Sequence, residues 1–329
     1  MGVAPVRWGI LSTAAINEKL LAGARRSDAV EVVAVGSRDG DRAAEFAQRH
    51  GIARAHGSYE ALLADPEVEA VYVPLPNALH HPWTLKALAA GKHVLCEKPY
   101  SRRPVEVREA FDAAERAGLV LSEAYMYRYN PQIERLAELL RDGAIGELRT
   151  IASAFTHPCE DPDDARLSAE LDGGGLMDVG CYCVSAARLL AGEPEALTAQ
   201  QDLGPSGVDV RLAGTLSFAG GVLAHFDCGF HVPDRSHLEV VGSAGTIRVN
   251  DPWHCLEPGI LLTRADGAVE VIAPAVESSY RLELERVGDA VRGAGGPPPL
   301  GREDALGQAR AIAALYRAAE SGAAVRPGD

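Results

Sequence analysis

Residues 6–38 read VRWGILSTAAINEKLLAGARRSDAVEVVAVGSR, and this stretch decides the fold of the first third of the chain. The run Val6–Leu11 is apolar enough for a buried strand, and Ala15–Arg25 follows it with the spacing of a helix. A second apolar run, Val30–Val35, completes a strand–helix–strand unit. Because parallel strands need a crossover of this length, we predict a parallel sheet that starts here.

The same alternation continues outward from this unit to about residue 124. Short apolar runs predict strands, and helical patterns lie between them. The count and order of these segments match a doubly wound nucleotide-binding sheet. The further predicted strands are Ala70–Pro74, His93–Cys96 and Leu119–Glu123, and the further helices are Asp41–His50, Tyr59–Ala64, His81–Ala90 and Pro104–Ala117.

After residue 124 the period changes, and segments with alternating polar and apolar residues dominate. The predicted hairpins pair Val210–Phe218 with Val222–Phe230 and Leu238–Val241 with Thr246–Val249; a strand is predicted at Leu148–Phe155, and helices at Pro131–Arg141, Leu176–Ala191 and Asp304–Ser321. We therefore predict an α/β chain with a Rossmann dinucleotide-binding domain (1–124) and an α+β domain (125–329) that binds substrate on a largely antiparallel open sheet. An open sheet leaves one face to be covered, so we expect a homodimer or homotetramer.

Composition excludes several classes of protein. The 329 residues include 32 Lys and Arg against 46 Asp and Glu, a net charge of -14, which repels nucleic acid. No apolar run is long enough to span a membrane, and the N-terminal residues lack a signal-peptide pattern. The six cysteines are few and scattered, as expected of reduced thiols. We expect a cytoplasmic protein with no nucleic-acid or membrane partner.

The turn after the first strand has the place of a dinucleotide-binding loop. Such a loop brings backbone N–H groups and a helix N-terminus to the pyrophosphate. Here small residues stand where glycines are usual. The predicted cofactor contacts at this turn are Gly9, Ser12, Thr13, Ala14, Ala15 and Ile16. The residues taken alone are equally compatible with an ordinary strand–helix loop.

The second strand ends at the turn that distinguishes the two nicotinamide dinucleotides. An enzyme that prefers NAD usually has an acidic residue here to hold the ribose hydroxyls. This chain instead offers Ser37 and Arg38, a hydroxyl and a guanidinium suited to a 2′-phosphate. We therefore expect NADP(H) to be preferred, with NAD(H) as the alternative cofactor. Asp39 is placed to cap the next helix, and a solvated Arg38 is the competing interpretation.

Two further loops follow strands of the predicted sheet, where ligands of open α/β sheets bind. The first contributes Pro74, Leu75, Asn77 and His80 as cofactor contacts, and the second contributes Glu97 and Lys98. A lysine directly after a buried strand is unusual unless its charge is used. Plain surface turns are the alternative for both loops.

The third motif lies in the second domain, where Gly173–Gly175 precede Asp178 and Tyr182. Three glycines allow the backbone to approach another group closely. Asp178 and Tyr182 are four residues apart, so they share one face of the predicted helix. The alternative is a core tyrosine beside an ion-paired aspartate.

Together, these motifs resemble those of the glucose–fructose oxidoreductase / inositol 2-dehydrogenase (Gfo/Idh/MocA) superfamily over essentially the whole chain. The matching elements are the loop after Gly9, Pro76-Asn77-x-x-His80, Glu97-Lys98-Pro99 and the Gly173–Tyr182 segment. Tyrosine at position 182, where many members have histidine, is similar to the branch of D-xylose dehydrogenases, dimeric dihydrodiol dehydrogenases and sugar 3-ketoreductases. The segment from Glu123 to Pro131 resembles that branch too.

The resemblance implies an oxidoreductase that interconverts a hydroxyl and a carbonyl on a sugar, polyol or cyclic diol. Tyr182 is the predicted acid/base; Lys98 would stabilise charge on the substrate oxygen and assist the phenol, and Asp178 would orient substrate or lysine. Lys98 as the proton donor is the alternative assignment. The predicted substrate contacts are Lys98, Arg128, His157, Arg166, Asp178 and Tyr182, with surface charge as the competing interpretation of Arg128, His157 and Arg166.

Two other functions fit the same fold. A non-catalytic dinucleotide sensor is disfavoured by the presence of Lys98, Asp178 and Tyr182 together. An imine or enone reductase is disfavoured by the polar groups at Asp178 and Arg128. Hydride transfer to a nicotinamide needs no metal, and consecutive carboxylates in the 159–164 loop are typical of solvated surface, so we predict no metal site.

Overall fold

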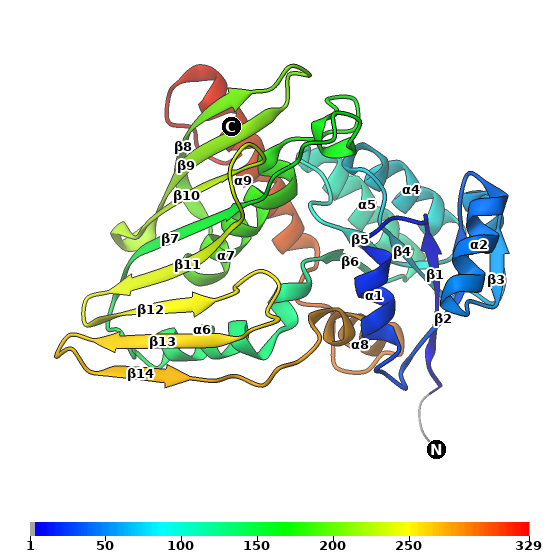
Figure 1. Cartoon of the computed structure of the whole chain (residues 1–329), viewed down its shortest axis with the longest axis horizontal. Helices are drawn as coiled ribbons and strands as arrows, with labels where there is room; N and C mark the ends of the chain where they lie inside the picture. The colour runs from blue at the N-terminus through cyan, green and yellow to red at the C-terminus, as the bar shows by residue number, and fades with distance from the viewer. Residues whose placement is uncertain (1–3, 329) are drawn as a thin grey trace. The chain divides into compact units, whose positions relative to one another are not determined.

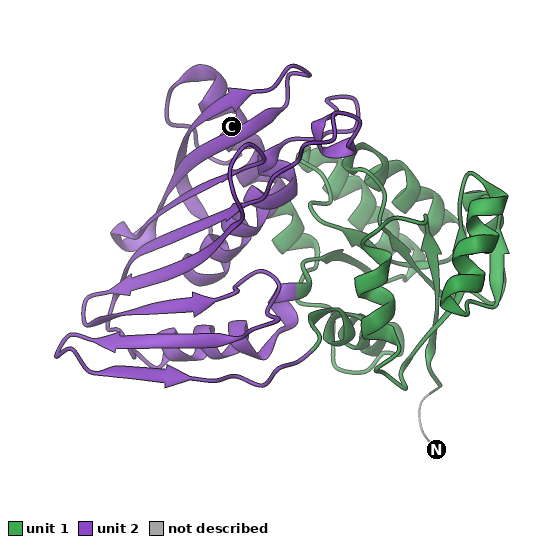
Figure 2. Cartoon of the chain, viewed as in Figure 1, with its two compact units in different colours: residues 1–126, 278–306 green, residues 127–277, 307–329 purple. Residues whose placement is uncertain are grey.

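A computed structural model describes residues 4–328 of the chain. The chain forms two compact units, drawn in green and purple in Figure 2. Unit 1 contains the residues up to Met126 together with Ser278–Leu306, and unit 2 contains Tyr127–Glu277 and the residues from Gly307 onward. The segment Ser278–Leu306 thus returns to the first unit, whereas the sequence placed everything after residue 124 in one second domain.

Unit 1 is built on a parallel sheet of six strands in the order β3-β2-β1-β4-β5-β6, which confirms the predicted Rossmann architecture (Figure 1). The strands are β1 (Val6–Leu11), β2 (Val30–Gly36), β3 (Arg54–His56), β4 (Ala70–Val73), β5 (His93–Glu97) and β6 (Leu121–Ala124). The helices are α1 (Asn17–Ala24), α2 (Gly40–His50), α3 (Tyr59–Leu63), α4 (Asn77–Ala89), α5 (Pro104–Ala117) and α8 (Ser279–Val291). The short edge strand β3 and the returning helix α8 were not predicted.

The core on one face of this sheet includes residues from α1 and α8. Trp8, Ile10, Tyr72 and Leu95 from the strands meet Leu284 of α8 in one buried cluster. Burial of such side chains stabilises a fold by about 1.5–3 kcal/mol each. Helix α8 is therefore part of the nucleotide-binding unit, although it lies far along the chain.

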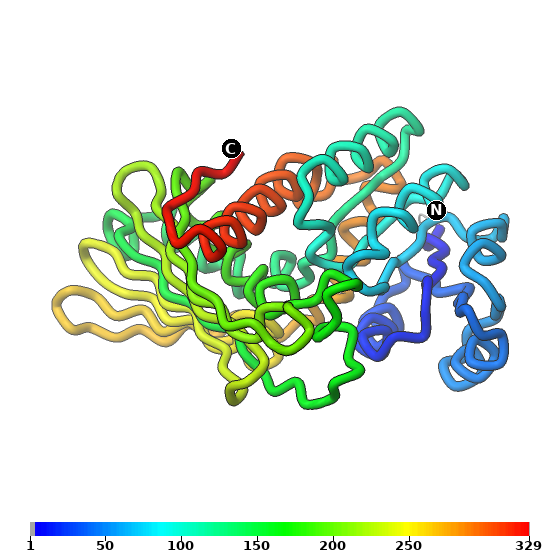
Figure 3. Tube along the Cα trace, turned by 90° about the horizontal axis from the view of Figure 1, so that it is seen from above, coloured from blue at the N-terminus to red at the C-terminus, as the bar shows by residue number. Residues whose placement is uncertain are grey.

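Unit 2 is built on a mixed sheet of eight strands in the order β14-β13-β12-β11-β7-β10-β9-β8, and all pairs are antiparallel except β7 with β10. Figure 3 shows these strands as one layer. The strands are β7 (Leu148–Thr156), β8 (Pro194–Leu203), β9 (Asp209–Phe218), β10 (Leu223–Gly229), β11 (Arg235–Gly242), β12 (Gly245–Asn250), β13 (Gly259–Arg264) and β14 (Val269–Ile272). The helices are α6 (Pro131–Arg141), α7 (Cys181–Ala191) and α9 (Arg302–Ser321). The first residues of α9 lie in unit 1. Both predicted hairpins, β9–β10 and β11–β12, are present.

The predicted helix Leu176–Ala191 is not a single α-helix. It begins with a π-helical turn over Leu176–Gly180, and α7 follows from Cys181. Gly180 packs closely on Cys228, because a Cβ at Gly180 would lie 2.6 Å from the Cys228 sulfur, so a larger residue would force one of the two to move. Single π-turns of this kind are frequent at functional sites.

Two observations bear on the wider predictions. The six cysteines, all within the described residues, form no disulfide, and five of them are buried. No helix within residues 4–328 combines the length and the apolar character needed to cross a bilayer.

Candidate cofactor and substrate sites

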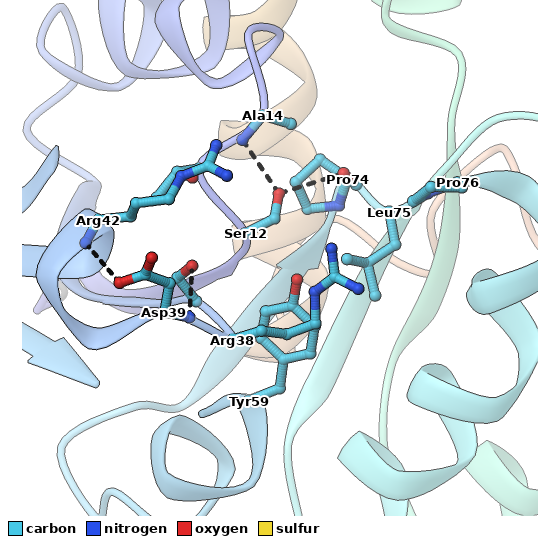
Figure 4. Close-up of a pocket in the computed structure, with 11 residues that line it drawn as sticks. Ser12, Ala14, Arg38, Asp39, Arg42, Tyr59, Pro74, Leu75 and Pro76 are labelled. Atoms are coloured by element: carbon cyan, nitrogen blue, oxygen red, sulfur yellow. Dashed lines mark hydrogen bonds between the residues drawn. The ribbon is translucent and has the colours of Figure 1, made fainter. Parts of the chain in front are cut away.

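Unit 1 has a cavity of about 460 Å³ at the carboxyl ends of β1, β2 and β4 (Figure 4). Its walls come from the loops after these strands, from the first turn of α2 and from the start of α3. The lining residues are Ser12, Thr13, Ala14, Ser37, Arg38, Asp39, Arg42, Tyr59, Pro74, Leu75 and Pro76. This is the place where the sequence predicted the adenosine half of a dinucleotide.

The turn after β1 is held by side chains rather than by glycines. Ser12 has a φ of 137°, a conformation that favours glycine. Its hydroxyl donates to the carbonyl oxygen of Pro74 (3.3 Å) and accepts from the N–H of Ala14 (3.2 Å). The amide of Asn17 donates to the carbonyl oxygen of Ser12 (2.8 Å). These contacts pin the backbone in the tight turn that a pyrophosphate loop needs.

Gly9, the one glycine of the motif, has a different task. A Cβ there would lie 2.8 Å from Leu62 and 3.0 Å from Val68, so the glycine allows α3 and its loop to pack on β1. Gly9 therefore contributes to the packing of the elements that carry the site. Ala15 lines a neighbouring cavity of about 350 Å³ together with Thr13 and Ala14.

The turn after β2 carries two guanidinium groups. Arg38 follows the strand, and Arg42 lies in the first turn of α2; both line the cavity. The Asp39 carboxylate accepts from the N–H groups of Asp41 (2.9 Å) and Arg42 (3.2 Å), so it caps α2 as predicted. Sequence reasoning missed Arg42, although its place four residues after Arg38 was a usable signal.

The loops after β4 and β5 are joined beneath the site by His80. Its ring is fully buried, with Nε2 2.7 Å from the carbonyl oxygen of Leu75 and Nδ1 3.0 Å from that of Pro99. Burial lowers the pKa of His80 to about 4. The imidazole is therefore neutral at pH 7 and has a single N–H, so it donates to one of the two carbonyl oxygens while its buried ring lies between both loops. Contact with a cofactor stays a prediction.

Glu97 and Lys98 form the next turn. The Glu97 carboxylate accepts from the Lys98 backbone N–H (3.1 Å) and from the Tyr72 hydroxyl. The carboxylate therefore fixes the start of the turn that presents Lys98. Asn77 opens helix α4.

In unit 2, the Asp178 carboxylate accepts hydrogen bonds from two of the predicted substrate contacts. One of its oxygens accepts from His157 Nε2 and from Arg166 Nε, each at 3.0 Å. Arg166 also contacts both oxygens of Asp164 at 3.0–3.2 Å. The hydrogen bond to Asp178 raises the pKa of His157 above its usual value, so the imidazole keeps its proton over a wider pH range.

Tyr182 lies in an aromatic cluster. Its side chain is 6% exposed, and its ring centre lies 5.6 Å from that of Tyr127, 5.3 Å from Phe155 and 6.0 Å from Trp253. Arg128 donates to the hydroxyl of Ser185 on α7 (3.3 Å). The cluster restricts the phenol to one orientation, as an acid/base group needs.

The glycine triplet packs against protein. A Cβ at Gly173 would lie 2.3 Å from the Arg166 carbonyl oxygen, and one at Gly174 would lie 2.1 Å from an Asp209 oxygen. Buried Asp209 accepts from the Leu176 N–H (2.7 Å) and from the Tyr316 hydroxyl (2.8 Å). Asp209 therefore anchors the π-helical turn that carries Asp178, and nothing local in the sequence indicated it.

Comparison with known proteins supports the dinucleotide-binding architecture of unit 1. A family described as "Oxidoreductase family, NAD-binding Rossmann fold" matches residues 6–125, and the "GFO/IDH/MocA C-terminal domain" matches residues 133–248. The chain belongs to the Gfo/Idh/MocA oxidoreductase family. The two matched segments lie in the two compact units, one in each.

Relatives of this Gfo/Idh/MocA protein include enzymes of known activity. It is 41% identical to D-xylose 1-dehydrogenase (NADP(+)) 2 of Haloferax volcanii, over 97% of this chain and 98% of that protein. It is 34% identical to a dTDP-3,4-didehydro-2,6-dideoxy-alpha-D-glucose 3-reductase of Actinomadura kijaniata, over 94% and 95%.

Solved structures match over nearly the whole chain. A 3-ketoreductase from Actinomadura kijaniata in complex with NADP and TDP-benzene superimposes with a TM-score of 0.90 at 32% identity, covering 95% of this chain and 98% of that one. An aldose-aldose oxidoreductase from Caulobacter crescentus complexed with glycerol has a TM-score of 0.91 at 28% identity, covering 98% and 99%. The fold and the cofactor domain are therefore shared with enzymes that act on sugars.

Proposed function

We propose that this protein is an NADP(H)-dependent oxidoreductase that interconverts a hydroxyl and a carbonyl on a sugar, polyol or cyclic diol. The observation that carries the proposal is the cavity at the carboxyl ends of β1, β2 and β4, where Arg38 and Arg42 line the turn that reads the cofactor ribose. Two guanidinium groups suit a dianionic 2′-phosphate. The NADP-dependent xylose dehydrogenase and the 3-ketoreductase solved with NADP support this choice of cofactor.

The cavity fits the nucleotide chemically. The Ser12 turn supplies backbone N–H groups, and Ser37, Arg38 and Arg42 supply donors at the ribose end, while the Asp39 charge is taken up by the helix cap. Hydride transfer at the carbinol carbon is the chemistry that the bound nicotinamide supplies.

The chain's own residues handle the proton. Tyr182 donates its phenolic proton to the substrate oxygen in reduction and takes it back in oxidation. Lys98 stabilises the negative charge that develops on that oxygen. Asp178 holds His157 and Arg166, and both side chains are substrate contacts of this proposal. Arg166 offers its Nη2 to polyol hydroxyls, whereas the second ring nitrogen of His157 lies 3.0 Å from the Pro158 carbonyl oxygen. Arg128 is a further substrate contact of this proposal.

Variants of the Actinomadura 3-ketoreductase support the pairing of lysine and tyrosine. Its structure was solved with one tyrosine replaced by phenylalanine and with one lysine replaced by alanine or glutamate. The two replaced positions are separated along that chain by as many residues as Lys98 and Tyr182 are here.

The test combines binding with turnover. NADPH binding is measured by fluorescence, and absorbance at about 340 nm then follows turnover of aldoses, ketosugars, inositols and dihydrodiols. On the best substrate, Tyr182→Phe is expected to lower kcat by about 10²–10⁴ with NADPH affinity unchanged, and Lys98→Met to lower it at least as much. Normal turnover by Tyr182→Phe with loss in Lys98→Met makes lysine the donor. Full activity of both variants overturns the assignment of the site.

The quaternary structure and location form a further part of the proposal. We place the protein in the cytoplasm as a homodimer or homotetramer that packs through the open face of the eight-stranded sheet. Strand β14 supports this, because Val269 and Val271, 59% and 76% exposed, project from the same side of an edge strand. Light scattering at micromolar concentration is expected to give at least twice the monomer mass.

A further inference from the structure

The phenol of Tyr59 lies in the wall of the cofactor cavity, and no motif pointed to it. Tyr59 is the first residue of α3, a helix capped by Ser58, whose hydroxyl accepts from the Ala61 N–H (3.1 Å). The tyrosine is 7% exposed, and its ring meets Trp83 edge to face with the ring centres 4.8 Å apart. The ring is therefore fixed both by its helix and by its neighbour.

Tyr59 lines the same cavity as Arg38 and Arg42, and the positive charges of both guanidinium groups act on its hydroxyl. Figure 4 shows the Arg38 side chain lying beside Tyr59. Burial raises the pKa of Tyr59 above its usual value, and the two guanidinium groups offset only part of that rise. The phenol is thus uncharged at neutral pH, and its oxygen can accept a hydrogen bond from the neighbouring guanidinium.

Arg38 needs such support because it is an exposed residue on a loop. A free arginine side chain has many rotamers, and binding a phosphate removes that freedom. A partner that holds the guanidinium in place before the ligand arrives reduces the entropy lost on binding. The rigid phenol of Tyr59 is such a partner, since it has few rotamers of its own.

We propose that Tyr59 is a positioning residue for cofactor choice: it holds Arg38 at the 2′-phosphate position and thereby raises the preference for NADP(H) over NAD(H). The inference rests on the proposed function, because it needs the cavity to hold the adenosine half of the cofactor. It adds that selectivity depends on a buried phenol as well as on the two arginines.

The test uses Tyr59→Phe, which removes the hydroxyl and keeps the ring that meets Trp83. Calorimetry of the full chain with 2′,5′-ADP and with 5′-AMP separates phosphate recognition from turnover. The variant is expected to bind 2′,5′-ADP about three- to tenfold more weakly and 5′-AMP within about twofold of wild type. With NADPH, KM should rise by a similar factor at unchanged kcat.

A double-mutant cycle with Arg38→Ala makes the test specific. If Tyr59 acts through Arg38, Tyr59→Phe has no further effect on 2′,5′-ADP affinity once Arg38 is gone. Tyr100→Phe, which removes a hydroxyl that lies 3.0 Å from His81, serves as the matched control and should bind both nucleotides normally.

Three results overturn the inference: unchanged 2′,5′-ADP affinity in Tyr59→Phe, equal losses for 2′,5′-ADP and 5′-AMP, or additive losses in the double variant. A wild-type protein that binds 5′-AMP as tightly as 2′,5′-ADP overturns the NADP(H) preference itself. Failure of the proposed cofactor preference is thereby distinguished from failure of the role of Tyr59.

Discussion

Neutralising Glu69 should destabilise unit 1 in a pH-dependent way. Glu69 lies between β1, β4 and the end of α8. Both of its oxygens accept from Arg292 at 2.9 Å, and one also accepts from the Arg7 N–H at 3.0 Å. These hydrogen bonds, led by those from Arg292, lower the pKa of Glu69 to about 2. Because Arg292 follows α8, this contact fastens the returning segment to the nucleotide-binding sheet.

The magnitude follows from linkage. The fall of the pKa from 4.5 to about 2 corresponds to at most about 3.4 kcal/mol, since one pKa unit is worth about 1.4 kcal/mol. The Glu69 side chain is 26% exposed, so water screens part of this, and we expect Glu69→Gln to cost about 1.5–2.5 kcal/mol at pH 7. A carboxylate with a lowered folded-state pKa stabilises the fold above pH 4.5 and loses that contribution as the pH falls toward 2.

The assay is urea unfolding of wild type and Glu69→Gln at about pH 7, 5 and 3, followed by the fluorescence of tryptophans such as the buried Trp8. The difference between the two proteins should shrink steadily below pH 5. Glu67→Gln is the control, because its ion pair with Arg7 is half exposed and should contribute nothing measurable. Equal stability at pH 7, or a difference that stays constant down to pH 3, contradicts the reasoning.

Three further predictions concern the cofactor turn, a buried acid and the glycine triplet. Arg38→Ala should remove most of the NADP(H) preference, a loss of about 1.5–3 kcal/mol in NADPH affinity with NADH affinity retained, and wild-type affinities that are equal for both cofactors contradict it. Glu283 in α8 is fully buried with no hydrogen-bond partner among the described residues, and burial raises its pKa well above 4.5. The folded protein therefore keeps the Glu283 proton that the unfolded chain releases above pH 4.5, so the stability of the wild type falls as the pH rises. Glu283→Gln should be the more stable protein at pH 7, by a margin that grows by at most about 1.4 kcal/mol per pH unit. A margin that does not depend on pH in urea unfolding would argue against this. Gly174→Ala should lower the stability of unit 2 by at least about 2 kcal/mol, because Gly174 has a φ of 122° and a Cβ there meets Asp209; a thermal midpoint equal to that of wild type would show that the loop relaxes freely.

Local patterns in the sequence determined most of the first unit and the place of the cavity proposed for the cofactor. Apolar runs with the right spacing predicted β1, β2, β4, β5 and β6 to within a few residues, because strand and helix periodicities are properties of short segments. Ser12, Ser37 and Arg38 line one cavity, as their places after β1 and β2 indicated, because the carboxyl ends of parallel strands meet at one edge.

Segments without a strong local pattern were missed. Strand β8 is polar along much of its length, as suits the edge of a sheet, and β3 has only three residues, so neither produces an apolar run. The helical turn over Leu176–Gly180 is π rather than α, and its first N–H is held by Asp209, which lies 33 residues along the chain.

Tertiary structure alone decided which distant residues complete each unit. Arg42 and Tyr59 reach the cofactor cavity because α2 and α3 both pack beside β2, and Asp209 reaches the glycine triplet from the start of β9. Helix α8 joins unit 1 through its apolar face and through the Arg292–Glu69 ion pair. The sequence contains each of these residues, but their partners lie dozens to hundreds of positions away, and burial and hydrogen-bond satisfaction between such partners are settled only when the whole chain folds.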